Sequence, residues 1–467
     1  MNVQTGFDRG KSLGDRERLV VIGNGMAGCR AVEEILALEP ARYAVTIFGA
    51  EPRVNYNRIM LSPVLAGEKT YDEIVINTAE WYAQNDITLV SGDPVIHIDR
   101  EACQVVSRGG RIESYDRLLI ATGSDPFVIP VPGKDLPGVV TFRDLDDVET
   151  MLAAAETSTK AVVIGGGLLG LEAAHGLSLR GMDVTVLHLM PTLMERQLDE
   201  AAGYLLKSEL EGRGMTILTG ADTAEILEKD GRVGGVKLKD GTKIEADLVV
   251  MAVGIRPNAT LAKASGLEVE RGIVVDDHMV TSDPNILAVG ECVQHRGACY
   301  GLVAPIWDMC RALAAGLATQ PKPYEGSVTS TKLKVSGVDL FSAGDFSGGE
   351  DCEDIVMRDA ARGIYKRVVV KDDRVIGAVL YGDTQDGNWY FDLLKNQEDV
   401  SDIREALIFG QAFASGGGAL DPNAAVAALS DDAEICGCNG VSKGQVIACI
   451  NEGAASVDAV RSTCKAS

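Results

Sequence analysis

The chain has 467 residues, of which 46% are hydrophobic, and it carries a formal net charge of −24 at pH 7. Its length suffices for about three domains with buried cores, and its acidic balance argues against a nucleic-acid or acidic-membrane partner. No apolar run reaches membrane-spanning length, and ten scattered cysteines suit a reducing cytoplasm. The polar segment 1–17 lacks the apolar stretch of a secretory signal, and we expect it to be a disordered leader.

The first predicted element is a buried aliphatic strand at 19–22 that runs directly into a glycine-rich bend and a helix. The bend has the spacing G-x-G-x-x-G, and its glycines are Gly23, Gly25 and Gly28. The first permits a tight reversal, the second leaves room for a pyrophosphate beside the backbone, and the third lets the helix pack close to the strand. The helix begins near Met26 and Ala27, where unpaired N–H groups and a partial positive charge favour phosphate. We therefore predict a dinucleotide site at this bend.

An acidic residue follows the second strand of this pattern. The strand is predicted at 44–48, and Glu51 lies at about the distance at which such sites place an acid for the ribose. The alternative is that Glu51 is a solvated loop carboxylate. A loop at 51–69, a helix around 78–85 and further strands lead to a strand at 118–123, after which several prolines mark a domain boundary.

The same plan then repeats, beginning with a strand, a glycine-rich bend and a helix. The residues expected at the second dinucleotide are Gly165, Gly167, Leu168, Leu169 and Gly170, with Gly254 at the end of a closing strand. A repeat of these elements in the same order indicates two dinucleotides that meet. His188 follows the second strand of the repeat, at 183–187, where an NAD-specific site normally has an acid. A cation there would favour NADPH and a neutral packed ring would not, so the preference between NADH and NADPH stays open.

The remaining chain is predicted to hold smaller elements. These are a strand at 285–291 that ends on Gly290 and Glu291, a helix at 305–317, an antiparallel sheet over 328–383, and helices around 389–397 and 401–411. A glycine-rich linker then leads to a tail with the pattern Cys436-Gly437-Cys438.

Together these motifs resemble those of pyridine-nucleotide-dependent flavoprotein reductases with two dinucleotide-binding domains. The resemblance covers about residues 18–320 and implies FAD at the first bend and NAD(P)H at the second. It also implies that the flavin lies along Ala121, Thr122 and Gly123, and that Gly290 and Glu291 contact its ribityl chain. The alternative for Glu291 is an ordinary acid at a helix N-terminus. In such reductases the flavin carries the chemistry, so no acid–base residue is required.

Four stretches resemble the large subunit of assimilatory NAD(P)H-dependent nitrite reductase more closely. They are 56–62, 186–199, 331–345 and 435–441. In that family electrons pass from NAD(P)H to FAD and then through iron–sulfur centres to siroheme, where nitrite becomes ammonia. The tail resembles a bacterioferritin-associated ferredoxin fold, whose [2Fe–2S] cluster needs a C-x-C and a later C-x-x-C.

The second cysteine pair of that tail is missing from the sequence. Cys436 and Cys438 are therefore the candidate ligands of an incomplete cluster, and the spacing of Cys449 and Cys464 does not supply the missing pair. We expect siroheme to lie outside this chain, which would be either a fragment of the longer enzyme or a diaphorase subunit of a split one.

Two charged residues are the candidates for the catalytic site. Arg58 follows Asn57 in a loop that, by the resemblance, reaches the flavin. Related ferredoxin reductases have a lysine where this chain has Pro63, and that lysine pairs with a glutamate at the position of Glu172. Because an unpaired buried carboxylate is costly, we expect Arg58 to pair with Glu172. The alternative is that Glu172 faces the nicotinamide with water. The same loop has no cysteine, which disfavours thiol chemistry and favours one-electron export.

The predicted fold class is α/β, with two Rossmann-like dinucleotide-binding domains, a small α+β interface domain and a short helical C-x-C tail module. The predicted boundaries are 18–125 with 246–320 for the FAD domain, 126–245 for the NAD(P)H domain, 325–412 for the interface domain, 413–429 for a linker and 430–467 for the tail. By family position, we expect the interface domain to form a homodimer.

The sequence therefore predicts a cytoplasmic FAD-dependent NAD(P)H oxidoreductase. It would pass electrons for nitrite reduction to a downstream iron–sulfur/siroheme domain or to a small electron-carrier protein. One alternative is a stand-alone NAD(P)H:ferredoxin or rubredoxin reductase. Another is a non-catalytic flavin redox sensor or scaffold, which would not reduce a dye at the expense of NAD(P)H.

Overall fold

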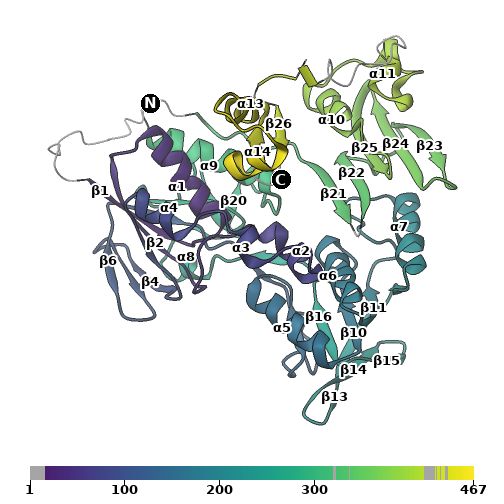
Figure 1. Cartoon of the computed structure of the whole chain (residues 1–467), viewed down its shortest axis with the longest axis horizontal. Coiled ribbons are helices and arrows are strands. Elements are labelled where there is room, and N and C mark those ends of the chain that lie inside the picture. Colours follow the sequence, from purple (N-terminus) through teal and green to yellow (C-terminus); the bar gives the residue numbers. More distant parts are fainter. Residues whose placement is uncertain are drawn as a thin grey trace. The chain divides into compact units, whose positions relative to one another are not determined.

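The computed structural model describes residues 16–318, 322–335, 337–414, 426–427, 429–431, 433–436 and 440–466. The chain forms two compact units, each assembled from several segments of the sequence (Figure 1). The first unit comprises residues up to 57, 74–125 and 256–327, and the second comprises 58–73, 126–255 and 328–467. Within the described ranges, no helix has the length and apolar character that crossing a bilayer requires.

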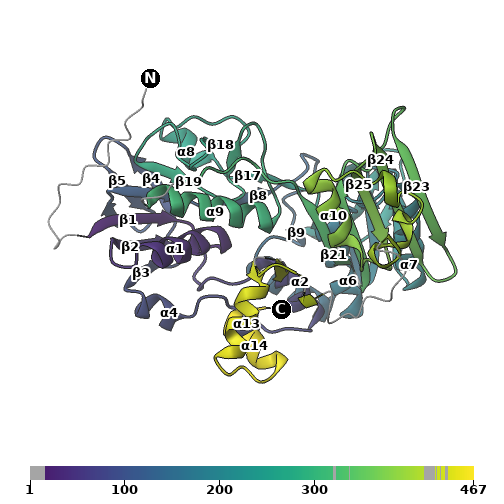
Figure 2. The same ribbon diagram turned by 90° about the horizontal axis from the view of Figure 1, so that it is seen from above.

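The first unit is built on a five-stranded parallel sheet with the order β19-β7-β1-β2-β3. Its strands are β1 (Glu17–Ile22), β2 (Tyr43–Phe48), β3 (Ile87–Val90), β7 (Arg117–Ile120) and β19 (Ile286–Ala288). β1 and β7 are aliphatic and largely buried, as expected where both faces of a parallel sheet are covered. The helices α1 (Met26–Leu38) and α9 (Val303–Leu317) pack against each other beside this sheet (Figure 2).

Smaller elements complete the first unit. They are α4 (Ala79–Gln84), α8 (Thr260–Ala264), an antiparallel sheet of β4 (Val95–Asp99), β5 (Gln104–Ser107) and β6 (Ile112–Ser114), and a parallel pair of β18 (Ile273–Val275) and β20 (Val293–His295). α4 confirms the helix predicted around 78–85. The short strands β8 (Ser124–Pro126) and β17 (Ile255–Pro257) lie where the chain passes from one unit to the other.

The second unit repeats the parallel sheet, with the order β12-β11-β10-β16-β9. Its strands are β9 (Val139–Thr141), β10 (Lys160–Ile164), β11 (Asp183–His188), β12 (Thr216–Thr219) and β16 (Leu248–Met251). The associated helices are α5 (Leu145–Thr157), α6 (Leu168–Leu179) and α7 (Glu200–Gly212), and an antiparallel sheet is formed by β13 (Thr223–Lys229), β14 (Arg232–Leu238) and β15 (Lys243–Glu245). The two parallel sheets confirm the predicted α/β class.

Two segments lie in the second unit although the sequence assigned them to the FAD domain. β16 pairs with β10, so that Leu248 lies opposite Ala161, and the boundary predicted at 246 is therefore wrong. The backbone N–H and C=O groups of β16 need hydrogen-bond partners, and β10 provides them. Residues 58–73 form η1 (Arg58–Met60), α2 (Leu61–Ala66) and α3 (Tyr71–Ile74). α2 packs on α6, where the Arg180 guanidinium donates a 2.7 Å hydrogen bond to the carbonyl of Leu65.

A five-stranded antiparallel sheet follows in the second unit, with the order β21-β22-β25-β24-β23, as predicted for 328–383. Its strands are β21 (Ser330–Val335), β22 (Val338–Gly344), β23 (Glu353–Asp359), β24 (Ile364–Lys371) and β25 (Arg374–Tyr381), with α10 (Gly387–Asn396) packed on β22 and β25. The helix predicted at 401–411 is wrong. That segment forms the 3-10 turns η2 (Ser401–Ile403) and η3 (Leu407–Phe409) before α11 (Gln411–Ala414), because burial of Val400 and Leu407 sets its path.

The tail contains β26 (Glu434–Cys436), β27 (Val441–Ser442), α13 (Lys443–Asn451) and α14 (Val457–Cys464). A capping box formed by Ser442 and Gln445 starts α13. The predicted leader and most of the predicted linker, residues 1–15 and 415–425, lie outside the described residues, as does Cys438. β1 already begins at Glu17, so the leader predicted to extend to 17 is too long there.

Candidate functional site

The bend after β1 has the backbone geometry of a phosphate cradle. Gly23 has φ +123°, and a Cβ there would lie 2.1 Å from the carbonyl oxygen of Ala121. A Cβ on Gly28 would lie 2.2 Å from the carbonyl oxygen of Gly23, whereas a Cβ on Gly25 would meet nothing within 4 Å. Two glycines are thus required by the packing of the chain itself, and the third borders open space that a ligand could enter.

The first turn of α1 leaves its N–H groups available to an anion. Gly25 is the N-cap in extended conformation and has no side chain to cap the helix, and no acidic residue lies in the first turn. Met26 and Ala27 therefore begin the helix where its dipole and N–H groups attract negative charge. The residues present fit a pyrophosphate.

The bend after β10 has nearly the same geometry. A Cβ on Gly165, which has φ +125°, would lie 2.2 Å from the carbonyl oxygen of Ala252, and one on Gly170 would lie 2.0 Å from that of Gly165. A Cβ on Gly167 would again meet nothing within 4 Å. The first turn of α6, starting with Leu168 and Leu169, likewise has no acid. Gly254, with φ +115°, also borders open space. This second cradle fits another pyrophosphate.

The two candidate ribose and ribityl acids of the first unit are held by hydroxyl groups. The hydroxyl of buried Tyr56 donates a 2.7 Å hydrogen bond to Glu51, and the hydroxyl of Ser124 donates one of 2.7 Å to Glu291. Glu291 directly follows Gly290, which has φ +97°. Both carboxylates are therefore oriented by neighbouring side chains rather than left as freely moving surface groups.

The strand end that the sequence assigned to the flavin is fixed by its backbone. The N–H of Ala121 donates to the carbonyl of Ile22, so this strand end lies beside the first cradle. Thr122 donates through its hydroxyl to the carbonyl of Asn258 at 2.6 Å, and the N–H of Asn258 donates to the carbonyl of Gly123.

The sequence did not predict the side chains that hydrogen-bond to Asn24, a residue of the first cradle. The Asn24 side-chain oxygen accepts a 2.7 Å hydrogen bond from the Tyr82 hydroxyl, and its amide donates to the carbonyl of Arg53. The Cys29 thiol also donates to Asn24, at 3.2 Å. Burial raises the pKa of Tyr82, which stays a neutral donor. The position of Asn24 between two glycines of the bend could have indicated a structural role. Its partners Tyr82 and Arg53 could not be predicted, because they lie far from it in the sequence.

The predicted ion pair between Arg58 and Glu172 is wrong. Among the described residues, the partner of Glu172 is Ser62, whose hydroxyl donates a 2.5 Å hydrogen bond to the carboxylate. Arg58 instead donates to the carbonyl of Arg143 at 3.0 Å. Burial raises the pKa of Glu172 to about 7, and the hydrogen bond from Ser62 opposes part of that rise. The free-energy cost of burying Glu172 is thus reduced because the group retains its proton to higher pH and accepts a hydrogen bond from one hydroxyl. No cation is needed for this. Asn57, also predicted in this loop, is buried, and its N–H donates to the carbonyl of Ile74.

His188 closes a network at the second cradle. Its Nδ1 accepts a 3.0 Å hydrogen bond from the N–H of Gly166, so Nε2 must carry the ring hydrogen. Nε2 lies 3.0 Å from the carbonyl oxygen of Thr192 and 3.1 Å from Oε2 of Glu195. Both ring nitrogens are engaged with the protein itself.

The predicted cluster ligands are described only in part. Cys436 is buried in β26, and Cys438 falls outside the described residues. In the ranges that the structure covers, no group of three or more His, Cys, Asp or Glu side chains is arranged to hold a metal. The thiols of Cys449 and Cys464, on α13 and α14, come within hydrogen-bonding contact, and burial together with that contact raises the pKa of Cys449.

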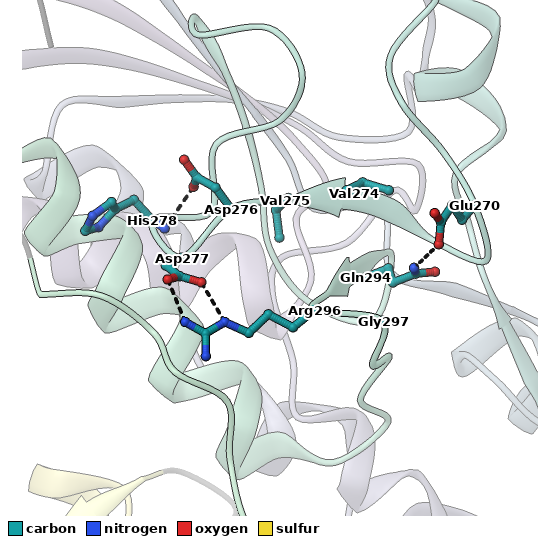
Figure 3. A pocket seen from close by; sticks show the side chains of 9 residues that line it. All are labelled: Glu270, Val274, Val275, Asp276, Asp277, His278, Gln294, Arg296 and Gly297. Atoms are coloured by element: carbon teal, nitrogen blue, oxygen red, sulfur yellow. Dashed lines mark hydrogen bonds and ion pairs between the residues drawn. The ribbon is translucent and has the colours of Figure 1, made fainter. Parts of the chain in front are cut away.

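A separate cavity of about 680 Å³ lies in the first unit (Figure 3). Its lining consists of Glu270, Val274, Val275, Asp276, Asp277, His278, Gln294, Arg296 and Gly297. Hydrogen bonds from Arg296 and His295 lower the pKa of Asp277 to about 2, so this carboxylate is ionised. The lining contains none of the predicted cofactor residues, and its carboxylates would repel a pyrophosphate.

Comparisons with known proteins agree with this geometry. Residues 17–305 match the family model of pyridine nucleotide-disulphide oxidoreductases, and residues 330–398 match the rubredoxin NAD+ reductase C-terminal domain. The chain is 51% identical over 454 residues to "Nitrite reductase [NAD(P)H]" of Bacillus subtilis, covering 97% of this chain and 56% of that protein. It is 43% identical over 436 residues to the assimilatory nitrate reductase electron transfer subunit of the same organism, covering 92% of this chain and 55% of that one.

Among solved structures, a ferredoxin reductase of Rhodopseudomonas palustris is similar, with a TM-score of 0.76 and 27% identity. That match covers 82% of this chain and 96% of the reductase. By contrast, the chain spans only about half the length of the two Bacillus relatives.

Proposed function

The chain belongs to the pyridine nucleotide-disulphide oxidoreductase family, and we propose that it takes hydride from NAD(P)H and passes electrons, through FAD, toward the reduction of nitrite. The repeated glycine cradle supports this proposal most directly, because each copy leaves open space at one glycine beside a helix N-terminus without an acid. Bound FAD would accept a hydride and release electrons singly.

In the proposal, the first cradle holds FAD. Gly23, Gly25 and Gly28 shape the cradle, and the N–H groups of Met26 and Ala27 bind the pyrophosphate. Glu51, held by Tyr56, accepts from the adenosine ribose, and Glu291, held by Ser124, accepts from the ribityl hydroxyls. Ala121, Thr122, Gly123 and Gly290 allow close approach of the backbone to the flavin, and Asn57 and Arg58 belong to a loop that reaches it.

The second cradle then holds NAD(P)H. Gly165, Gly167 and Gly170 shape it, Leu168 and Leu169 supply the N–H groups, and Gly254 leaves room near the nicotinamide. Glu172 follows this cradle on α6 and keeps a proton near neutral pH, which limits negative charge next to a hydride donor. Ser62 orients that carboxyl group.

We propose that the electron acceptor is a downstream iron–sulfur/siroheme domain, where nitrite is reduced, or a small electron-carrier protein. Cys436 and Cys438 would contribute two ligands to a [2Fe–2S] centre in the tail. The α+β interface domain predicted at 325–412 would form a homodimer, and the protein would act in the cytoplasm. Light scattering at micromolar concentration tests the dimer, and a monomer would contradict it.

A stand-alone ferredoxin or rubredoxin reductase is the second candidate. The match of residues 330–398 to the rubredoxin NAD+ reductase C-terminal domain and the similarity to a ferredoxin reductase favour it. Reduction of rubredoxin or of a [2Fe–2S] ferredoxin as fast as that of ferricyanide would support this candidate over nitrite assimilation.

The main proposal is tested by spectra and anaerobic titration of the purified chain. We expect a yellow protein whose flavin absorption is bleached by one equivalent of NADH or NADPH, and which then reduces ferricyanide but not nitrite. A chain that stays colourless after incubation with FAD would refute the proposal. A coloured chain that is not bleached by either nucleotide would instead indicate a sensor or scaffold.

A further inference from the structure

The loop after β11 folds back onto the second cradle and is tied to it at one residue. The N–H of Gly166 donates to Nδ1 of His188, and the carbonyl of Gly166 accepts a 3.0 Å hydrogen bond from the N–H of Met194. Met194 has φ +53°, an uncommon conformation for a residue other than glycine, which turns the chain back toward the cradle. The loop is therefore a fixed part of the cradle wall.

Glu195 follows directly and brings a carboxylate to the end of β11. Its Oε2 accepts from Nε2–H of His188 at 3.1 Å, while Oε1 has no hydrogen-bond partner among the described residues. The side chain of Glu195 retains 37% exposure, so this second oxygen can reach a ligand. The acid that dinucleotide sites normally carry at the end of their second strand is missing from position 188, but it is supplied seven residues later.

The charge of this arrangement is negative. His188 cannot donate from Nδ1, because that nitrogen accepts from Gly166, so the ring serves as a neutral spacer between the backbone and Glu195. It therefore does not offer a cation to a 2′-phosphate, which was one of the two possibilities that the sequence left open. The exposed apolar side chains of Leu189 and Met190 lie next in the chain and suit the face of an adenine ring.

We propose that Glu195, positioned by His188, accepts a hydrogen bond from the ribose 2′-hydroxyl of NADH and excludes the 2′-phosphate of NADPH. This inference rests on the proposed function of the second cradle. A carboxylate gains a charge-assisted hydrogen bond from a hydroxyl but repels a phosphate. Arg196 is the competing group, since it is exposed in the same loop and a guanidinium there would attract that phosphate.

The test is equilibrium binding of NAD+ and NADP+ to the FAD-loaded full chain by titration calorimetry. We expect the parent protein to bind NAD+ more tightly, and Glu195→Gln to reduce the ratio of the two affinities by roughly tenfold to a hundredfold. Glu195 is on the surface, so the variant should fold. Glu156→Gln, which also removes one exposed carboxylate from the second unit, is the matched control and should leave the ratio unchanged.

Two further variants separate the roles of the loop residues. His188→Asn should reduce the ratio in the same direction as Glu195→Gln, because Glu195 loses the hydrogen bond that positions it. Arg196→Gln should not reduce the ratio, because loss of a cation cannot favour the 2′-phosphate. A parent protein that prefers NADP+, or an unchanged ratio in Glu195→Gln, would overturn the role of Glu195. If instead the parent protein binds neither nucleotide, the proposed function itself fails.

Discussion

The hydroxyl of Ser62 donates a 2.5 Å hydrogen bond to the carboxylate of Glu172, 110 residues later in the chain. Both residues belong to the second unit, Ser62 on α2 and Glu172 on α6. A neutral hydroxyl stabilises a carboxylate far less than a cation does. The proton affinity of Glu172 is therefore set mainly by burial.

Glu172→Gln should remove a pH dependence of stability. The folded pKa of about 7 exceeds the ordinary value of 4.5, so the folded state binds more protons between these pH values and stability falls as pH rises through that window. The full difference corresponds to about 3 kcal/mol. We expect the variant to match the parent protein near pH 5 and to be more stable above pH 7. Thermal unfolding from pH 5 to pH 8 checks this, and parallel curves for the two proteins would contradict it.

Ser62→Ala should raise the pKa of Glu172 further, because the lost hydrogen bond favours the ionised form. The carboxylic-acid C=O band, assigned by infrared difference against Glu172→Gln, should persist to higher pH than in the parent protein. Ser62→Thr keeps the hydroxyl and is the control. A midpoint that does not move in Ser62→Ala would show that the hydroxyl does not influence the proton.

The glycine bends could be predicted from sequence because their causes are local. Gly23 and Gly165 each avoid a clash with a strand end of the same sheet, and the spacing of the bend records this requirement. The partner of Glu172 could not be predicted in the same way. A ferredoxin-reductase pattern suggested a cation, but the segment containing Arg58 and Ser62 packs on the second unit so that only the hydroxyl meets the carboxylate.

Dependence on the tertiary fold also explains two other differences between the predictions and the structure. Glu195 meets His188 next to Met194, which adopts a left-handed conformation that its residue type does not indicate. The boundary predicted at residue 246 put β16 in the FAD domain, whereas its pairing with β10 places it in the second unit. Local sterics are encoded in residue spacing, whereas side-chain partners depend on which segments the tertiary fold brings together.

Gly25→Ala should mainly impair FAD binding, whereas Gly23→Ala should mainly destabilise the fold. The Cβ at position 25 enters open space, so the variant should lose less than about 1 kcal/mol of stability but bind FAD poorly, because the methyl group occupies the cradle. The Cβ at position 23 meets a carbonyl oxygen at 2.1 Å and requires a strained φ, so that variant should lose about 3 kcal/mol or more. Flavin absorption and the melting temperature of the flavin-free chain check both. Full flavin content in a stable Gly25→Ala protein would contradict the assignment of the first cradle.

Lys366 should be essential to the stability of the antiparallel sheet. Its side chain is 5% exposed on β24, and its ammonium lies 2.8 Å from Asp383 and 3.5 Å from Asp386. Lys366→Met would leave two partly exposed carboxylates beside the core without their cation, which costs about 1–3 kcal/mol. Lys160→Met removes an exposed pair with Glu245 and should leave unfolding by denaturant unchanged.

Adding Asp383→Asn and Asp386→Asn to Lys366→Met should recover much of the loss. If the loss came from the missing side-chain packing alone, these added changes would recover nothing, because they restore no volume at position 366. Denaturant unfolding of the full chain, followed by tryptophan fluorescence to which Trp389 in the adjacent helix α10 contributes, would separate the two explanations.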